Sequence, residues 1–282
     1  IGLNTPLAGL SRQNARRVAT YLIDSGKATG TVRRYLTDIR AVINLALIEH
    51  DIPAANPFSK IDLPNDGLSQ RDLRISIPDE IIAKMLRDLK AKENQQPFLV
   101  FALLYLTGAR LGEITALQCI DMFLDHEVPH IWIRPNVIRR LKTNWSARQI
   151  PVCQTTLSLL RTAMQNTSDE EYLFPNYKEG RGADRASARL MKVLRHHTPD
   201  KRITVHSLRH NFRDRIRILG IPFEQGKALE GRKYSQGEEA HYGSVTTQWI
   251  KALHLSIKKI NSNNTGPICL LRQLSHFIID NE

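Results

Sequence analysis

Cysteine is scarce in this sequence, and neither a long apolar run nor a secretory leader pattern is present. Three cysteines occur in 282 residues, and Cys119, Cys153 and Cys269 lie too far apart for a paired zinc-ligand motif or a disulfide framework. No apolar stretch approaches the length of a membrane span, and the N-terminus lacks the basic-then-apolar order of a signal peptide. These absences predict a cytoplasmic protein with free thiols and no membrane partner.

Acidic residues are outnumbered by basic ones. The chain has 28 Asp and Glu against 40 Lys and Arg, which gives a net charge of +12. An excess of this size attracts polyanions, and nucleic acid is the first partner to consider. The alternative is a basic soluble protein without such a partner.

Metal ligands show no clear pattern in the sequence. Asp and Glu are scattered along the chain, and no acidic cluster has the spacing of a metal site. We expect no metal and no other cofactor.

Two helical patterns separated by glycines occupy the N-terminal region. Ser11 is a candidate cap for a helix over residues 11–24 with Val18, Tyr21 and Leu22 inward. A second helix, capped by Thr31, carries an apolar stripe. The stripe comprises Val32, Tyr35, Leu36, Ile39, Val42, Ile43, Ala46 and Leu47. The pattern therefore predicts a small helical domain over residues 1–58 and a linker over residues 59–74.

A second, larger domain is predicted over residues 75–260. The continuous apolar run at 97–107 predicts a helix buried on all sides, which Gly108 ends, and Arg110 follows at the junction with another helix. Alternation after His130 predicts strands at 130–134, 137–139 and 148–152, with Lys142 in a connecting turn. Helices follow at about 155–165 and 184–196. The expected fold is mainly α with a small antiparallel β-sheet, and 261–282 form an apolar tail.

Residues 205–242 read as helix, turn, helix, loop and tyrosine. His206 and Arg209 are spaced i, i+3, so a helix that begins near Ser207 presents both side chains on one face. Gly220 closes this helix, and Tyr242 follows the next one among small and polar residues. Taken alone, the segment is better explained as a solvated basic helix and a packed tyrosine, because the His-x-x-Arg spacing is a weak signal.

The motifs in combination are more specific than any one of them. Arg110 in TGARLGE, Lys142 in LKTNWSARQIPV, His206 and Arg209 in HSLRH, and Tyr242 in HYG follow one another in chain order. In this order and context the chain resembles the tyrosine recombinases, the phage integrase family. The resemblance covers most of the chain, because residues 1–58 also resemble the helical core-binding domain of that family. It implies a two-domain clamp around DNA, whose C-terminal tail docks on a neighbouring protomer or packs in cis.

The resemblance also implies a reaction and a role for each motif residue. Tyr242 is then the nucleophile that attacks the scissile phosphate and leaves a 3′-phosphotyrosyl link and a free 5′-hydroxyl. Arg110 and Arg209 stabilise the charged phosphate, because guanidinium groups are bidentate and permanently charged. Lys142 protonates the leaving 5′-oxygen, and His206 accepts the tyrosine proton or donates a hydrogen bond to the phosphate. This scheme uses no metal.

One position departs from the family pattern. Where the family has Leu-x-Gly-His, or Trp in place of the His, this chain has Leu229-Glu230-Gly231-Arg232. Arginine donates hydrogen bonds but accepts no proton near neutral pH, so either activity is reduced or Arg232 is a third phosphate clamp. His241 is a second candidate for the missing imidazole, and Tyr234 is a rival nucleophile.

The resemblance implies a site-specific recombinase of a prophage or other mobile element, bacterial or phage-encoded and nucleoid-associated. Its expected partners are double-stranded DNA, further copies of the chain in a tetrameric synapse, and an accessory DNA-bending or directionality factor. Because the chain begins at Ile1 without methionine, the resemblance also leaves room for an N-terminal arm-binding domain. Two alternatives stay open: a nicking and rejoining enzyme like the type IB topoisomerases, and a DNA-binding remnant that no longer cleaves.

Overall fold

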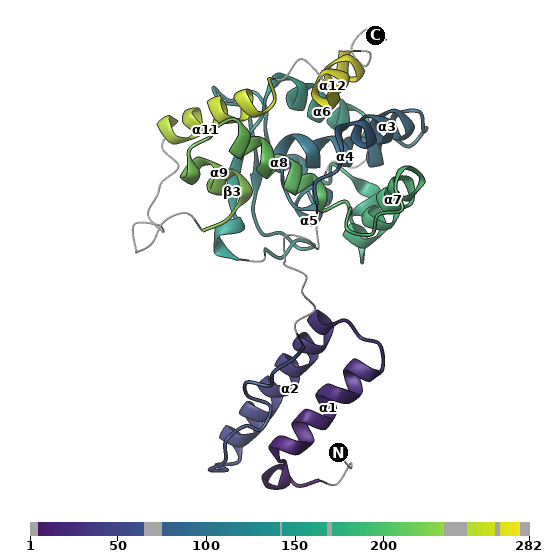
Figure 1. The fold of residues 1–282 in the computed structure, drawn as a ribbon. Coiled ribbons are helices and arrows are strands. Elements are labelled where there is room, and N and C mark those ends of the chain that lie inside the picture. Colours follow the sequence, from purple (N-terminus) through teal and green to yellow (C-terminus); the bar gives the residue numbers. More distant parts are fainter. Residues whose placement is uncertain are drawn as a thin grey trace. The chain divides into compact units, whose positions relative to one another are not determined.

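The computed structural model describes residues 5–64, 75–141, 143–167, 171–233, 247–262 and 266–276. The chain divides into two compact units, Ile1–Arg71 and Asp72–Glu282, and the division falls within the segment predicted as a linker. Figure 1 shows a helical hairpin in the first unit and a larger set of helices around a small sheet in the second.

The first unit contains a short 3-10 helix, η1 (Leu7–Gly9), and two α-helices, α1 (Arg12–Asp24) and α2 (Thr29–Glu49). Ser11 caps α1 as predicted: its hydroxyl accepts a hydrogen bond from the Asn14 amide at 3.2 Å. The predicted cap of α2 is wrong, because the helix begins at Thr29 after Ala28 and has no side-chain cap. Fully buried Val32 lies in the first turn, so packing against α1 rather than a polar cap fixes this end.

The core of the first unit differs from the predicted stripes at two positions. Tyr21 and Val42, both expected to face inward, are exposed. Small side chains, Ala15 and Ala19, occupy the interface instead, and short side chains let two helices approach closely. The buried residues are Ala15, Ala19, Val32, Leu36, Ile43 and Phe58.

The second unit is organised around one buried helix, α4 (Gln96–Thr107). Helices α3 (Asp79–Lys90), α5 (Leu111–Thr115), α6 (Gln154–Gln165), α7 (Gly182–His197) and α8 (Ser207–Ile218) all pack against it. Gly108 ends α4 in the left-handed conformation, with φ of 64°. A β-carbon there would lie 2.3 Å from the Phe212 ring, so glycine is needed both for the backbone and for the approach of α8.

Three short antiparallel strands form a sheet in the order β1 (Met122–Phe123), β2 (His130–Ile133) and β3 (Arg148–Pro151). In the β2–β3 register, Ile131 lies opposite Ile150, and both are fully buried. The short 3-10 helices η2 (Cys119–Asp121), η3 (Asn144–Ser146) and η4 (Pro175–Tyr177) lie in the connections. The predicted fold class, mainly α with a small antiparallel sheet, is confirmed.

The strand predicted at residues 137–139 is wrong. The Asn136 side chain accepts hydrogen bonds from the amides of Ile138 and Arg139, at 3.2 and 2.7 Å, and this closes a turn. Asparagine favours such turns because its side chain competes for backbone donors. The third strand of the sheet is β1 instead, a two-residue element too short for alternation to reveal.

Helices α9 (Phe223–Glu230), α11 (Thr247–Ile260) and α12 (Gly266–His276) complete the second unit. Helix α12, in the segment predicted as a tail, packs in cis against α3 and α6 (Figure 1). It buries Ile268 and Leu271 in the main core. Among the described helices, none is both long and apolar enough to cross a bilayer.

Candidate active site

Arg110 lies at the junction of α4 and α5, and Glu113 holds it there. Its backbone amide donates to Glu113 Oε2 at 2.8 Å, and its Nη1 donates to Glu113 Oε1 at 2.6 Å. A second contact joins Nη1 to Ser146 Oγ at 3.3 Å. The Arg110 side chain stays 27% exposed, so the guanidinium is fixed on the protein side and open to solvent on the other.

Arg148, the first residue of β3, connects three parts of the site. Its Nη2 donates to Glu113 Oε2 at 2.9 Å, its Nε to the Leu229 carbonyl at 2.9 Å, and its Nη1 to the Ser146 carbonyl at 2.8 Å. Burial acts to raise the pKa of Glu113, but the charge and hydrogen bonds of Arg148, with those of Arg110, lower it to about 2. Glu113 is therefore a permanent carboxylate that orients two arginines.

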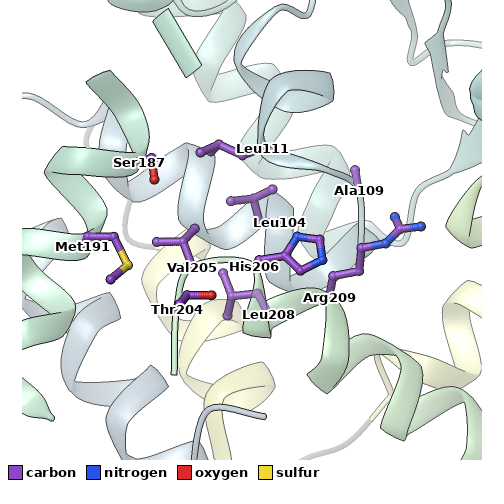
Figure 2. Close-up of a pocket in the computed structure, with 10 residues that line it drawn as sticks. All are labelled: Leu104, Ala109, Leu111, Ser187, Met191, Thr204, Val205, His206, Leu208 and Arg209. Carbon is purple, nitrogen blue, oxygen red and sulfur yellow. The ribbon is translucent and has the colours of Figure 1, made fainter. Parts of the chain in front are cut away.

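His206 precedes α8 and Arg209 lies in its first turn. Both border a cavity of about 320 Å³, where Figure 2 shows the His206 ring beside the Arg209 side chain. The cavity is otherwise lined by Leu104, Ala109, Leu111, Ser187, Met191, Thr204, Val205 and Leu208. The His206 side chain is exposed, whereas Arg209 is buried and donates to two carbonyls, of Gly108 at 2.6 Å and of Glu230.

Positive charge is concentrated around Arg209. Burial and the neighbouring charges of Arg148 and Arg110 lower the pKa of Arg209 to about 9. The guanidinium remains charged near neutral pH, so three cations share one small region. An anion placed among them would remove their mutual repulsion, and this is the electrostatic character of a phosphate site.

A second carboxylate, Glu230, holds the arginine at the position where the sequence departs from the family pattern. Its Oε1 accepts from Arg213 Nε at 2.9 Å, and its Oε2 lies 3.6 Å from Arg232 Nη1. Glu230 is 4% exposed and Arg232 is 41% exposed. Gly231, between them, adopts the left-handed conformation with φ of 62° and allows the chain to turn back toward Arg148.

The structure brings together four of the predicted site residues, Arg110, His206, Arg209 and Arg232, around α8 and the ends of α4 and α9. Two others, Lys142 and Tyr242, lie outside the described residues, as do the alternatives His241 and Tyr234. In the part of the chain that the structure describes, no three His, Cys, Asp or Glu side chains gather into a metal-binding group.

Sequence reasoning missed Glu113, Arg148 and Glu230 as parts of this site. Glu113 carried a signal, because a glutamate three residues after a helix N-cap can accept from the N-cap amide, and Glu113 does so from Arg110. Arginine cannot supply the other half of a capping box, since its side chain has no acceptor. Arg148 and Glu230 lie inside motifs that the sequence already pointed to, but nothing local showed what they contact. Arg148 reaches Glu113 and Leu229, and Glu230 reaches Arg213, only because β3, α8 and α9 pack together.

Comparison with known proteins identifies the family. The profile of the phage integrase family matches residues 79–224, which include Arg110, His206 and Arg209. The chain is 26% identical over 215 residues to tyrosine recombinase XerD of Oceanobacillus iheyensis, a match that covers 72% of this chain and 67% of that protein. It is 27% identical over 211 residues to tyrosine recombinase XerC of Roseiflexus castenholzii, covering 73% of this chain and 66% of that protein.

Solved structures with the same fold include two integrases bound to DNA. The Tn1549 transposon integrase in complex with a circular intermediate DNA has a TM-score of 0.61 and 17% identity, and covers 84% of this chain and 85% of that chain. A lambda integrase tetramer bound to a Holliday junction also has a TM-score of 0.61 and 17% identity, and covers 84% of this chain and 65% of that chain. The chain belongs to the phage integrase family, the tyrosine recombinases, so the predicted family and its enzyme class are confirmed.

Proposed function

We propose that this protein cleaves and rejoins DNA strands at specific sites through a 3′-phosphotyrosyl intermediate formed on Tyr242. The observation that carries the proposal is the cation cluster at the ends of α4, α8 and α9. Five arginines, Arg110, Arg148, Arg209, Arg213 and Arg232, surround two buried carboxylates, Glu113 and Glu230. The cluster keeps an excess of positive charge, which suits a phosphodiester.

The arginines fit the demands of phosphoryl transfer. As the phosphate passes to its transition state, negative charge spreads over the non-bridging oxygens, and donors that are already oriented stabilise it at no further cost of reorganisation. Arg110 and Arg209 are held by protein acceptors at 2.6 Å, so their orientation is set before DNA binds. We assign these two residues to the phosphate oxygens and Arg232 to the same phosphate as a third donor.

The remaining roles follow from the motif residues. The Tyr242 oxygen attacks phosphorus, the bond to the 5′-oxygen breaks, and the strand stays linked to the protein through its 3′-phosphate. Lys142 gives a proton to the leaving 5′-oxygen, since lysine has a proton it can lose and arginine effectively does not. His206, exposed at the mouth of the cavity, accepts the tyrosine proton or donates a hydrogen bond to the phosphate. Attack by a 5′-hydroxyl then reverses these bond changes and joins a strand.

DNA and further copies of this chain are the proposed partners. A net charge of +12 favours phosphate contacts, whose affinity falls steeply with salt. The structural similarity to a lambda integrase tetramer bound to a Holliday junction supports assembly into a tetramer on paired sites. Similarity to a transposon integrase supports a role for the protein in a mobile element. As part of the same proposal, the protein acts on DNA in the cytoplasm, with an accessory factor for direction.

A nicked suicide substrate tests the proposal. The substrate is built from DNA that flanks the gene and loses a short fragment after cleavage, so the covalent protein–DNA adduct accumulates and is read on a denaturing gel. Wild-type protein is expected to form the adduct and Tyr242→Phe to form none, while the matched variant Tyr234→Phe behaves as wild type. Salt-sensitive binding without an adduct, on every flanking site, would instead identify a DNA-binding remnant.

Recombination distinguishes the two enzymatic alternatives. A recombinase exchanges strands between two copies of its site, so a plasmid that carries both copies is expected to yield deletion or inversion products. A topoisomerase-like enzyme would relax the same supercoiled plasmid without any rearrangement of its sequence.

A further inference from the structure

Glu230 makes two unequal ion pairs from a buried position. Arg213 approaches Oε1 with both Nε and Nη2 at 2.9 Å. Arg232 approaches Oε2 through Nη1 alone, at 3.6 Å, and 41% of its side chain is exposed. The carboxylate therefore has one close partner on α8 and one looser partner, and the looser one occupies the position where the family has histidine.

Arg213 is the closest charge that compensates the burial of Glu230, and the buried Arg209 adds a second favourable charge nearby. A buried carboxylate needs an opposite charge with well-formed hydrogen bonds, and the Arg213 contacts supply these. The pairing with Arg232 adds little to that compensation, because its separation is long and its head group is partly in water. Its effect is geometric, since the Arg232 guanidinium lies on the side of the turn that faces Glu230.

The backbone that carries Glu230 is itself fastened to the site arginines. Arg148 donates to the Leu229 carbonyl at 2.9 Å, and Arg209 donates to the Glu230 carbonyl. Gly231 turns directly over Arg148: a β-carbon on this glycine would lie 2.5 Å from Arg148 Nη1. The Glu230 carboxylate is therefore a fixed point relative to Arg148 and Arg209, and Arg232 is attached to that point.

We propose that Glu230 is a positioning residue for DNA cleavage, which holds Arg232 in reach of the scissile phosphate; this inference rests on the proposed function. Arginine has a long, flexible side chain, and a free arginine at this position would spend most of its time away from the phosphate. The ion pair limits that freedom before DNA binds, which is preorganisation. Glu230 and Arg232 thus form one unit in place of the rigid imidazole.

A double-mutant cycle tests this coupling. Single-turnover cleavage of the suicide substrate is measured at saturating protein for wild type, Glu230→Gln, Arg232→Ala and the double variant. Glu230→Gln is expected to slow cleavage roughly tenfold in the wild-type background and to have no further effect once Arg232 is alanine. DNA affinity in Glu230→Gln is expected to hold or rise, because a negative charge has been removed. Asp125→Asn, which removes a carboxylate from the exposed pair with Arg161, is the matched control and cleaves as wild type.

A purely structural role for Glu230 gives a different result. If Glu230 acts only by supporting α8 through Arg213, then Glu230→Gln slows cleavage by the same factor in both backgrounds, and the proposal is overturned. Glu230→Asp covers the case in which Glu230→Gln folds poorly, because it keeps the charge for Arg213 and shortens the reach to Arg232. It is expected to melt near wild type and to cleave several-fold more slowly only when Arg232 is present. Absence of any adduct with wild-type protein is a separate outcome, in which the proposed function fails and this inference with it.

Discussion

Two arginine–carboxylate clusters lie in the second unit, and they differ in how completely the arginines are satisfied. In the first, Asp121 is fully buried and accepts from Arg139 Nη2 at 3.0 Å and from Arg134 Nε at 2.7 Å. The other Arg139 donors reach the carbonyls of Arg134, Glu113 and Ala116, at 2.7 to 3.1 Å. Protein acceptors thus engage every nitrogen of Arg139.

The second cluster, around Glu113 and Glu230, is open. Arg110 and Arg232 each make their carboxylate contact through Nη1 and stay partly exposed. An arginine whose fork is fully engaged by the protein stabilises the fold, whereas one with donors facing solvent can bind a phosphate. Residue type is the same in both clusters, so the difference lies in the number of acceptors that tertiary packing supplies.

Breaking the closed cluster should have the largest effect. Arg139→Met removes a buried cation and leaves Asp121 without one of its two partners, and the free energy of unfolding is expected to fall by about 3–5 kcal/mol. Urea denaturation measures this loss. Arg161→Met, in the exposed pair with Asp125, is the control and should cost less than about 1 kcal/mol. Equal losses in the two variants would mean that Arg139 is not a structural residue.

Changing the open cluster should affect catalysis instead of folding. Arg110→Lys keeps the charge and a donor for Glu113 but loses the planar fork, so single-turnover cleavage is expected to fall roughly 10²–10³-fold. The melting temperature should change little. Arg161→Lys serves as the matched control, with wild-type cleavage expected. A wild-type rate in Arg110→Lys would refute the assignment of Arg110 to the phosphate.

Low pH should reduce the free energy of unfolding through protonation of Glu113 in the open cluster. Its pKa is lowered from 4.5 to about 2, so the unfolded state takes up a proton first as the pH falls. The stabilisation is complete above pH 4.5 and is lost as the pH falls through about 2, with a loss on the order of 3 kcal/mol. Urea denaturation at several pH values measures this. Glu113→Gln should show a shallower pH dependence in that window, and an unchanged slope would contradict the assignment.

The smallest expected effect is a difference in cleavage rate between alanine variants of two glycines with similar backbone conformation. Gly231 and Gly220 have φ of 62° and 60°, so alanine at either should cost about 1–2 kcal/mol of stability. A new β-carbon meets Arg148 only at Gly231, whereas nothing lies within 4 Å of it at Gly220. Gly231→Ala is therefore expected to slow cleavage several-fold as Arg148 moves, and Gly220→Ala to leave the rate unchanged. Equal cleavage rates in both variants would show that the position of Arg148 does not matter for cleavage.

Local sequence predicted the elements that depend on local interactions. The Ser11 cap, the buried helix that ends at Gly108, and the start of α8 at Ser207 all follow from spacing, capping and backbone preference within a few residues. Prediction failed where a competing contact decided the outcome. The Asn136 side chain closed a turn in place of a strand, and packing of Val32 started α2 ahead of the polar cap expected at Thr31.

The sequence by itself determined the family, the fold class and the motif residues, because each motif is a short run whose chemistry is carried by residue type and order. Tertiary structure alone decided which arginines have all their donors engaged by the protein and which keep donors facing solvent. Arg148 reaches Glu113 and Leu229, and Arg209 reaches Gly108 and the Glu230 carbonyl. These contacts join residues far apart in the chain, so no local pattern encodes them, and they come into existence only when α4, α8, α9 and β3 pack together.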